Sequence, residues 1–78
     1  MPTILKLNGY RFFFYSNEHT PEHIHVEKQN CAAKFSLEPV ELVKSKGFNS
    51  NEINELRKMV LENQQLFKSK WYEYFSNQ

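Results

Sequence analysis

The sequence is poor in cysteine, in net charge and in long apolar runs, and each shortage excludes a class of protein. Among 78 residues there is one cysteine, Cys31, so an internal disulfide is excluded and the cytoplasm is the expected compartment. The net charge is only +1, which argues against a strongly electrostatic nucleic-acid binder but leaves room for a local basic face. The opening segment MPTILKLNGYRFFFYS is apolar but carries Lys6, Arg11 and a turn, so we expect neither a signal peptide nor a membrane span.

Aromatic residues, by contrast, are abundant. They make up 15% of the chain, within a composition that is 40% hydrophobic and 24% charged, which is the balance of a globular protein. No repeat, linker or low-complexity segment divides the sequence, so we expect a single domain over residues 1–78. A domain of this size buries only about 60% of the surface of its unfolded chain, so a partner or an oligomer would add stability.

The first half of the sequence is typical of antiparallel strands. Asn8-Gly9 lies between two β-prone runs, which predicts a two-residue hairpin turn. The expected partners are Leu7 with Tyr10, Lys6 with Arg11, Leu5 with Phe12 and Ile4 with Phe13. Because side chains alternate across a sheet, one face then holds Leu5, Leu7, Tyr10, Phe12 and Phe14, and the other holds Ile4, Lys6, Arg11, Phe13 and Tyr15.

A second alternating segment runs from residue 23 to residue 28, and Gln29-Asn30 is a plausible turn after it. This register places His25 opposite Lys34. It also collects an apolar face from Ile24, Val26, Ala33, Phe35 and Leu37. Pro39 ends the following strand, and residues 40–43 form either a short fifth strand or an irregular connection.

The second half of the sequence is typical of a helix from about residue 50 to residue 76. Asn49 and Glu52 fit a capping box, and apolar residues recur at spacings of three, four or seven. Asn63 interrupts that stripe, which leaves room for a kink or break between residues 63 and 65. The predicted fold is α+β, an antiparallel β-meander of three to five strands packed on a C-terminal helix. Its predicted core comprises Phe12, Phe14, Ile24, Val26, Phe35, Ile53, Leu56, Val60, Phe67 and Trp71.

The chain resembles domain-of-unknown-function family 4160, a family of small prokaryotic proteins. The resemblance is carried by GYRFFFYSNE, HIHVE, AKFSLEPVEL, KGF and the late Trp71 with Phe75, and it runs over almost the whole chain. The sequence departs from the family pattern at Ser36, where a tryptophan is expected, and in the extra His19. The resemblance implies one component of a toxin–antitoxin-like pair with a partner protein encoded by the neighbouring gene. It implies no cofactor and no assigned catalytic residues.

All three histidines lie in NEHTPEHIHVE, and a metal site is one interpretation of that stretch. His23 and His25 project from one side of a strand, about 6.5–7 Å apart along it. Two imidazoles at that spacing can reach one ion, with Glu27 or His19 as a further ligand. The stretch lacks a strong metal-binding signature, so we expect no metal there.

A second interpretation is general acid–base catalysis by a metal-independent ribonuclease. His23 and His25 would transfer the protons, and Lys34 would stabilise the charged transition state.

A third interpretation, which we favour, is binding of a partner protein, with nucleic acid as the alternative ligand. The predicted binding residues are Arg11, Phe13, Tyr15, His23, His25, Glu27 and Lys34. They combine cations with aromatic rings on the sheet face away from the helix, where we expect Phe13 and Tyr15 to be exposed. The plainest interpretation gives these residues no function, the histidines being cross-strand neighbours and Glu27 pairing with Lys34.

Overall fold

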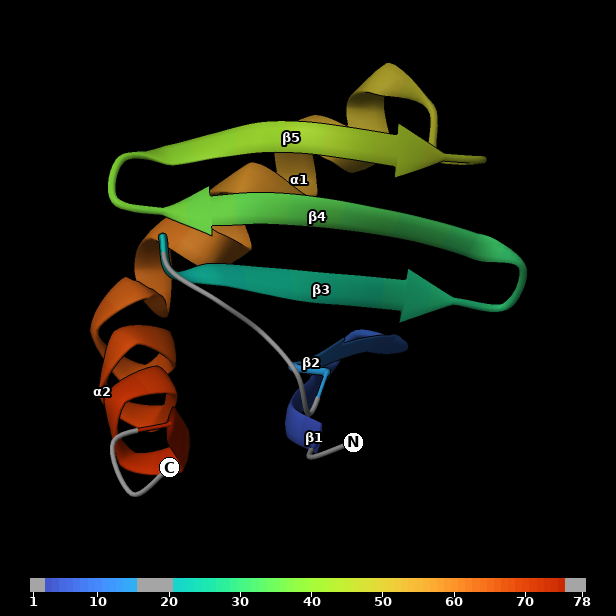
Figure 1. The fold of residues 1–78 in the computed structure, drawn as a ribbon. Helices are drawn as coiled ribbons and strands as arrows, with labels where there is room; N and C mark the ends of the chain where they lie inside the picture. Colours follow the sequence, from blue (N-terminus) through green and yellow to red (C-terminus); the bar gives the residue numbers. More distant parts are fainter. Residues whose placement is uncertain (1–2, 16–20, 76–78) are drawn as a thin grey trace.

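The computed structural model of the chain describes residues 3–15 and 21–75. Five strands come first: β1 (Thr3–Leu7), β2 (Tyr10–Phe13), β3 (His23–Lys28), β4 (Cys31–Leu37) and β5 (Val40–Lys46). Two helices follow, α1 (Ser50–Glu62) and α2 (Gln64–Phe75). The strands form one antiparallel sheet in the order β1-β2-β3-β4-β5, and both helices lie on the same side of it (Figure 1). The predicted α+β meander with C-terminal helix is confirmed.

Both predicted hairpins are present, because their turn residues adopt the backbone that such turns require. Asn8 and Gly9 have φ of 54° and 83°, and Gln29 has φ of 54°. The predicted pairing of His25 with Lys34 is confirmed. One predicted pair is wrong: Phe13 lies opposite Thr3 rather than Ile4, because the register of β1 shifts between Thr3 and Leu5.

Residues 40–43 belong to a genuine fifth strand, and that strand continues to Lys46. Its register on β4 shifts once: Lys34 lies opposite Lys44 and Phe35 opposite Leu42, so Val43 is an extra residue in β5. Such a β-bulge keeps the apolar Leu42 on the helix-facing side while the following lysine stays on the other side.

The start of α1 and the break between α1 and α2 both occur at asparagines whose side chains form hydrogen bonds with the backbone. The Asn49 side chain accepts a bond from the Glu52 amide at 2.8 Å, and Glu52 accepts one from the Asn49 amide at 3.1 Å, which confirms the capping box. The predicted break is also confirmed, because Asn63 separates α1 from α2. Its side-chain amide donates to the Met59 carbonyl at 2.8 Å. Gln64 then donates to the Leu37 carbonyl at 2.6 Å and ties the junction to the end of β4.

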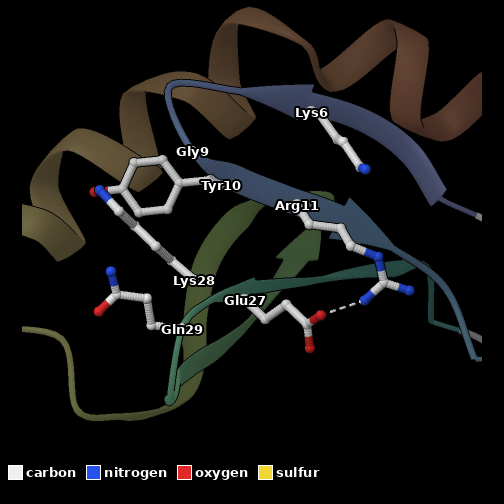
Figure 2. A pocket seen from close by; sticks show the side chains of 7 residues that line it. All are labelled: Lys6, Gly9, Tyr10, Arg11, Glu27, Lys28 and Gln29. Carbon is white, nitrogen blue, oxygen red and sulfur yellow. Dashed lines mark hydrogen bonds and ion pairs between the residues drawn. The ribbon is translucent and has the colours of Figure 1, made fainter.

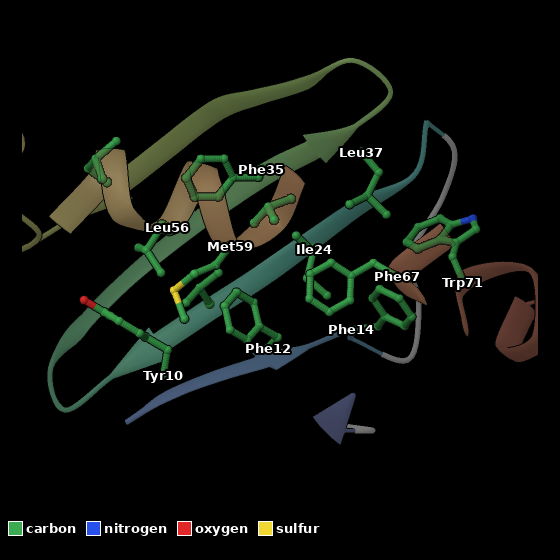
Figure 3. Packing of buried hydrophobic residues seen from close by; sticks show 14 residues of the cluster. Tyr10, Phe12, Phe14, Ile24, Phe35, Leu37, Leu56, Met59, Phe67 and Trp71 are labelled. Carbon is green, nitrogen blue, oxygen red and sulfur yellow. The ribbon is translucent and has the colours of Figure 1, made fainter. Parts of the chain in front are cut away.

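The hydrophobic core fills the space between the sheet and the helices (Figure 3). All ten residues predicted for the core are buried. Ring contacts join the two layers: Phe12 stacks on Phe67 at 5.3 Å between ring centroids, and Phe14 meets Trp71 edge to face at 5.2 Å. Leu7 of β1 lies opposite the buried Tyr10, as predicted, but its own side chain remains 38% exposed. The strand lies at the sheet edge, where the helices give it less cover.

No helix in residues 3–15 or 21–75 is long and apolar enough to cross a membrane.

Candidate functional site on the outer face of the sheet

The sheet face away from the helices, called the outer face below, displays side chains in rows that cross the strands. One row follows the pairs Lys6–Arg11, Arg11–Glu27, Glu27–Ala32 and Ala32–Lys46. The next row follows Phe13–His25, His25–Lys34 and Lys34–Lys44. These two rows together hold five cationic side chains and one carboxylate, although the whole chain carries a net charge of only +1. The folded chain therefore concentrates positive charge on this face.

The strongest concentration lies over β4 and β5. A hollow of about 350 Å³ there is lined by Lys34, Lys44 and Lys46, together with His25, Tyr15 and Ala32. The small Ala32 leaves room between the longer side chains. Within the described residues, none of the three lysines forms an ion pair. This group, Lys34, Lys44 and Lys46, is called the lysine cluster below.

Towards β1, the cationic row is partly neutralised. Arg11 forms an ion pair with Glu27, and its Nε donates to the Thr3 hydroxyl at 2.9 Å. Its guanidinium also lies 4.2 Å from the centroid of the Phe13 ring, a cation–π contact. Figure 2 shows the Arg11–Glu27 pair beside Lys6, at the edge of a second hollow of about 300 Å³. Glu27 therefore pairs with Arg11 and not with Lys34.

Phe13 is the largest departure from the expected outer face. We expected an exposed ring, but Phe13 is only 3% exposed. Its ring centroid lies 5.2 Å from that of Tyr15 and 5.5 Å from that of His25, with Arg11 above it. These rings form a small aromatic cluster separate from the main core. Tyr15 remains 45% exposed, as expected, so its ring is the most open of this cluster to a ligand.

His23 is also buried, contrary to its expected place on an open face. It is 8% exposed, and its ring centroid lies 5.1 Å from that of Trp71 in α2. Since a carbonyl can only accept, His23 Nδ1 is the donor in the 3.0 Å contact with the Pro21 oxygen. The ring is held by this bond and by Trp71, which explains its burial. The His25 ring lies 5.1 Å away, edge to face, and is more accessible.

The predicted metal ligands are not assembled in the part of the chain that the structure describes. No three His, Cys, Asp or Glu side chains gather there closely enough to hold an ion. Glu27 is engaged by Arg11, and His19 lies outside the described residues. The catalytic candidates His23, His25 and Lys34 are neighbours through cross-strand pairing and ring contact, but His23 is enclosed.

Two residues of the lysine cluster were missed by sequence reasoning. Lys44 and Lys46 lie beyond residue 43, where the fifth strand was expected to stop. The signal was partial, since KSK alternates with a period of two, but simple alternation from Val40 and Leu42 would place its lysines on the helix-facing side. A bulge at Val43 interrupts the simple alternation and hides it.

Groups with raised pKa values join the helices to the sheet rather than form the outer face. Burial, and then a hydrogen bond to Glu55 of α1, raises the pKa of Tyr10. A hydrogen bond to Glu38 raises the pKa of Lys68, and one to Glu22 raises the pKa of Tyr72. These contacts fasten α1 and α2 to the sheet.

Comparison with known protein families gives a match. The family model described as Domain of unknown function (DUF4160) matches residues 9–72. No curated protein and no solved structure matches the chain significantly. The match begins at the Asn8-Gly9 turn and ends in α2, so it includes the lysine cluster and the aromatic cluster.

Proposed function

We propose that the chain is a protein-interaction module. It belongs to the DUF4160 family, whose function is unknown, so this proposal is inferred from the side chains on its surface. The outer face of the sheet binds an acidic partner protein. That partner is the product of the neighbouring gene, in a toxin–antitoxin-like pair of the kind that the family resemblance implies.

One observation carries this proposal: Lys34 and Lys44 lie directly opposite each other on β4 and β5, with Lys46 beside them. Like charges at directly opposed positions destabilise a sheet. The helix-facing core does not need them, because they point away from it. An anionic ligand in the hollow would neutralise these lysines and remove their mutual repulsion, so the surface is suited to such a ligand.

The neighbouring aromatic cluster favours a protein as that ligand. The exposed Tyr15 lines the same hollow as the lysine cluster, and Arg11 and His25 pack against the rings beside it. Tyr and Arg are the residue types enriched where proteins bind proteins. The small domain also gains stability from any partner that binds only its folded state.

The ribonuclease hypothesis has less support. A pair of histidines that transfer protons must both reach the substrate. His23 is 8% exposed and is held between Pro21 and Trp71. Among the described residues, His25 and Lys34 are therefore accessible to a substrate, but no second accessible histidine stands beside them to transfer the other proton.

The test is binding to the purified product of the neighbouring gene, measured by titration calorimetry. Lys44→Gln should weaken binding, with a steep dependence on salt, because the charge is part of the interface. Lys58→Gln removes the same charge from the exposed side of α1 and is the matched control. Arg11 is a poor choice for this test, since it also holds Glu27, Thr3 and the Phe13 ring. Equal binding by the two lysine variants would contradict the proposal.

A further inference from the structure

β5 is the last strand at one edge of the sheet, so one of its sides has no neighbouring strand among the described residues. Within the described residues, no backbone–backbone hydrogen bond outside the sheet involves Val40–Lys46. An edge strand in this state presents open N–H and C=O groups, which are a template for another strand.

The second half of β5 is also the most open part of that edge. Val43, Lys44, Ser45 and Lys46 are all exposed, and Val43 is 54% exposed although it is apolar. Val43 is the extra residue of the bulge, so it has no partner position on β4. An apolar side chain in this position would be covered by a strand that added to β5.

The lysines of β5 define what such a strand must carry. Lys44 and Lys46 lie on the same face, two residues apart, which places them about 6.5–7 Å apart along the strand. An added extended segment has the same repeat, so its alternate side chains meet these lysines in turn. We propose that β5 accepts an extended acidic segment of the partner as a sixth strand, with carboxylates at alternate positions facing Lys44 and Lys46. This inference rests on the proposed function and specifies how the partner is held.

In the register centred on Ser45, a second copy of the chain fits this edge poorly. If two β5 strands paired antiparallel about Ser45, Lys44 of each copy would face Lys46 of the other. Directly opposed like charges are unfavourable, so the lysines oppose self-association in that register. An acidic strand removes the same repulsion, and the edge therefore selects its occupant by charge.

A single-stranded nucleic acid fits the edge less well than an acidic strand. Its phosphates would neutralise the lysine cluster, but they would leave the open backbone groups of β5 without partners and Val43 uncovered. An added acidic strand would neutralise the lysines, bond to the open backbone groups of β5 and cover Val43.

The first experiment is amide hydrogen exchange of the full chain, alone and in complex with the neighbouring gene product. We expect exchange to slow by about tenfold or more in the complex at those Val43–Lys46 amides that point to the open edge, because new ladder bonds protect them. The amides of Thr3–Leu7, in the strand at the other edge, are the internal control. If the complex forms, depends on Lys44, and leaves the β5 amides unprotected, strand addition is wrong while the proposed function stands.

The second experiment uses synthetic probes, so that it does not depend on the neighbouring gene product. One short peptide alternates glutamate with valine, a second has the same composition with its glutamates adjacent, and the third probe is a single-stranded oligouridylate. We expect the alternating peptide to bind about tenfold more tightly than the other two and to lose that advantage with Lys44→Gln and Lys46→Gln. Equal affinity for the two peptides, no binding of either, or tighter binding of the RNA would each overturn strand addition.

Discussion

Lys34 and Lys44 lie directly opposite each other on neighbouring strands, and neither forms an ion pair within residues 3–15 and 21–75. Their side chains point away from the core, towards a hollow that they share with Lys46. Removing one of the two charges should therefore separate stability from function. The folded chain loses the repulsion between the two lysines, and the binding surface loses part of its attraction for the acidic partner.

Lys44→Gln should raise the free energy of unfolding by a few tenths of a kcal/mol, because it removes a like-charge pair across two strands. The gain should shrink in high salt, which screens exposed charges. Urea unfolding at low and high salt measures both effects. Lys58→Gln, on the exposed side of α1, should show neither. A loss of stability in Lys44→Gln would show that the lysine pair does not repel.

Phe35→Ala should lower the free energy of unfolding by about 3–5 kcal/mol, because Phe35 is 0% exposed and its removal leaves a cavity between the layers. That is a large share of the stability of a domain this small. The measurement is the urea midpoint, with Leu61→Ala as the control, since Leu61 is 53% exposed on α1. A midpoint equal to that of the parent would contradict the assignment of Phe35 to the core.

The double variant His23→Gln, His25→Gln tests binding against catalysis. Glutamine keeps hydrogen bonding but cannot transfer protons at neutral pH. If the chain is an interaction module, the folded variant should still bind the neighbouring gene product, with its affinity lowered only by the loss of the His25 ring from the hollow. RNA cleavage and growth inhibition are measured beside binding. Activity lost in the folded, still-binding variant would favour the ribonuclease hypothesis.

Tyr10→Phe should change how stability depends on alkaline pH. Burial and the bond to Glu55 raise the pKa of Tyr10 in the folded chain above its ordinary value of 10.0. As pH rises above that value, the unfolded chain loses the tyrosine proton before the folded chain does, so the folded state becomes less stable. The parent should therefore lose more stability than Tyr10→Phe between about pH 8 and about pH 11. Urea unfolding across this range is the measurement, and parallel curves would contradict the burial of the phenol.

Gly47→Ala should destabilise the chain more than Gly9→Ala, although both glycines have positive φ, of 92° and 83°. A Cβ at Gly47 would lie 2.8 Å from Cys31 Sγ, whereas one at Gly9 would meet only the flexible Lys28 side chain at 3.3 Å. The backbone strain alone costs about 1–3 kcal/mol in either variant, and the contact with Cys31 adds to it at Gly47. Thermal unfolding of the two variants gives the difference. Equal destabilisation would mean that Cys31 moves aside without cost.

Local signals in the sequence were enough to predict most of the fold. The Asn8-Gly9 and Gln29-Asn30 turns set the registers around them, and His25 met Lys34 as expected. Asn63 interrupted the helical stripe and proved to be the residue between α1 and α2. In each case the turn, register or helix break is determined by residues that are close together in the sequence.

The candidate site was predicted less well, because burial depends on contacts between distant segments. Alternation of side chains correctly assigned Phe13 and His23 to the outer face. It could not predict that the Arg11 guanidinium would cover the Phe13 ring or that the Trp71 ring would pack against His23. Both residues were expected to be exposed, and both are buried. The end of β5 was missed because the bulge at Val43 breaks a period-two pattern by one residue.

The order of elements along the chain has a consequence for biosynthesis. All five strands precede both helices, and each strand pairs with its neighbour in sequence, so the hairpins need only short-range contacts. The apolar face bearing Phe12, Phe14 and Phe35 is nevertheless covered only when Phe67 and Trp71 have been made. During translation this apolar face of the nascent sheet therefore stays exposed until Phe67 and Trp71 have left the ribosome, and only then can the helices cover it.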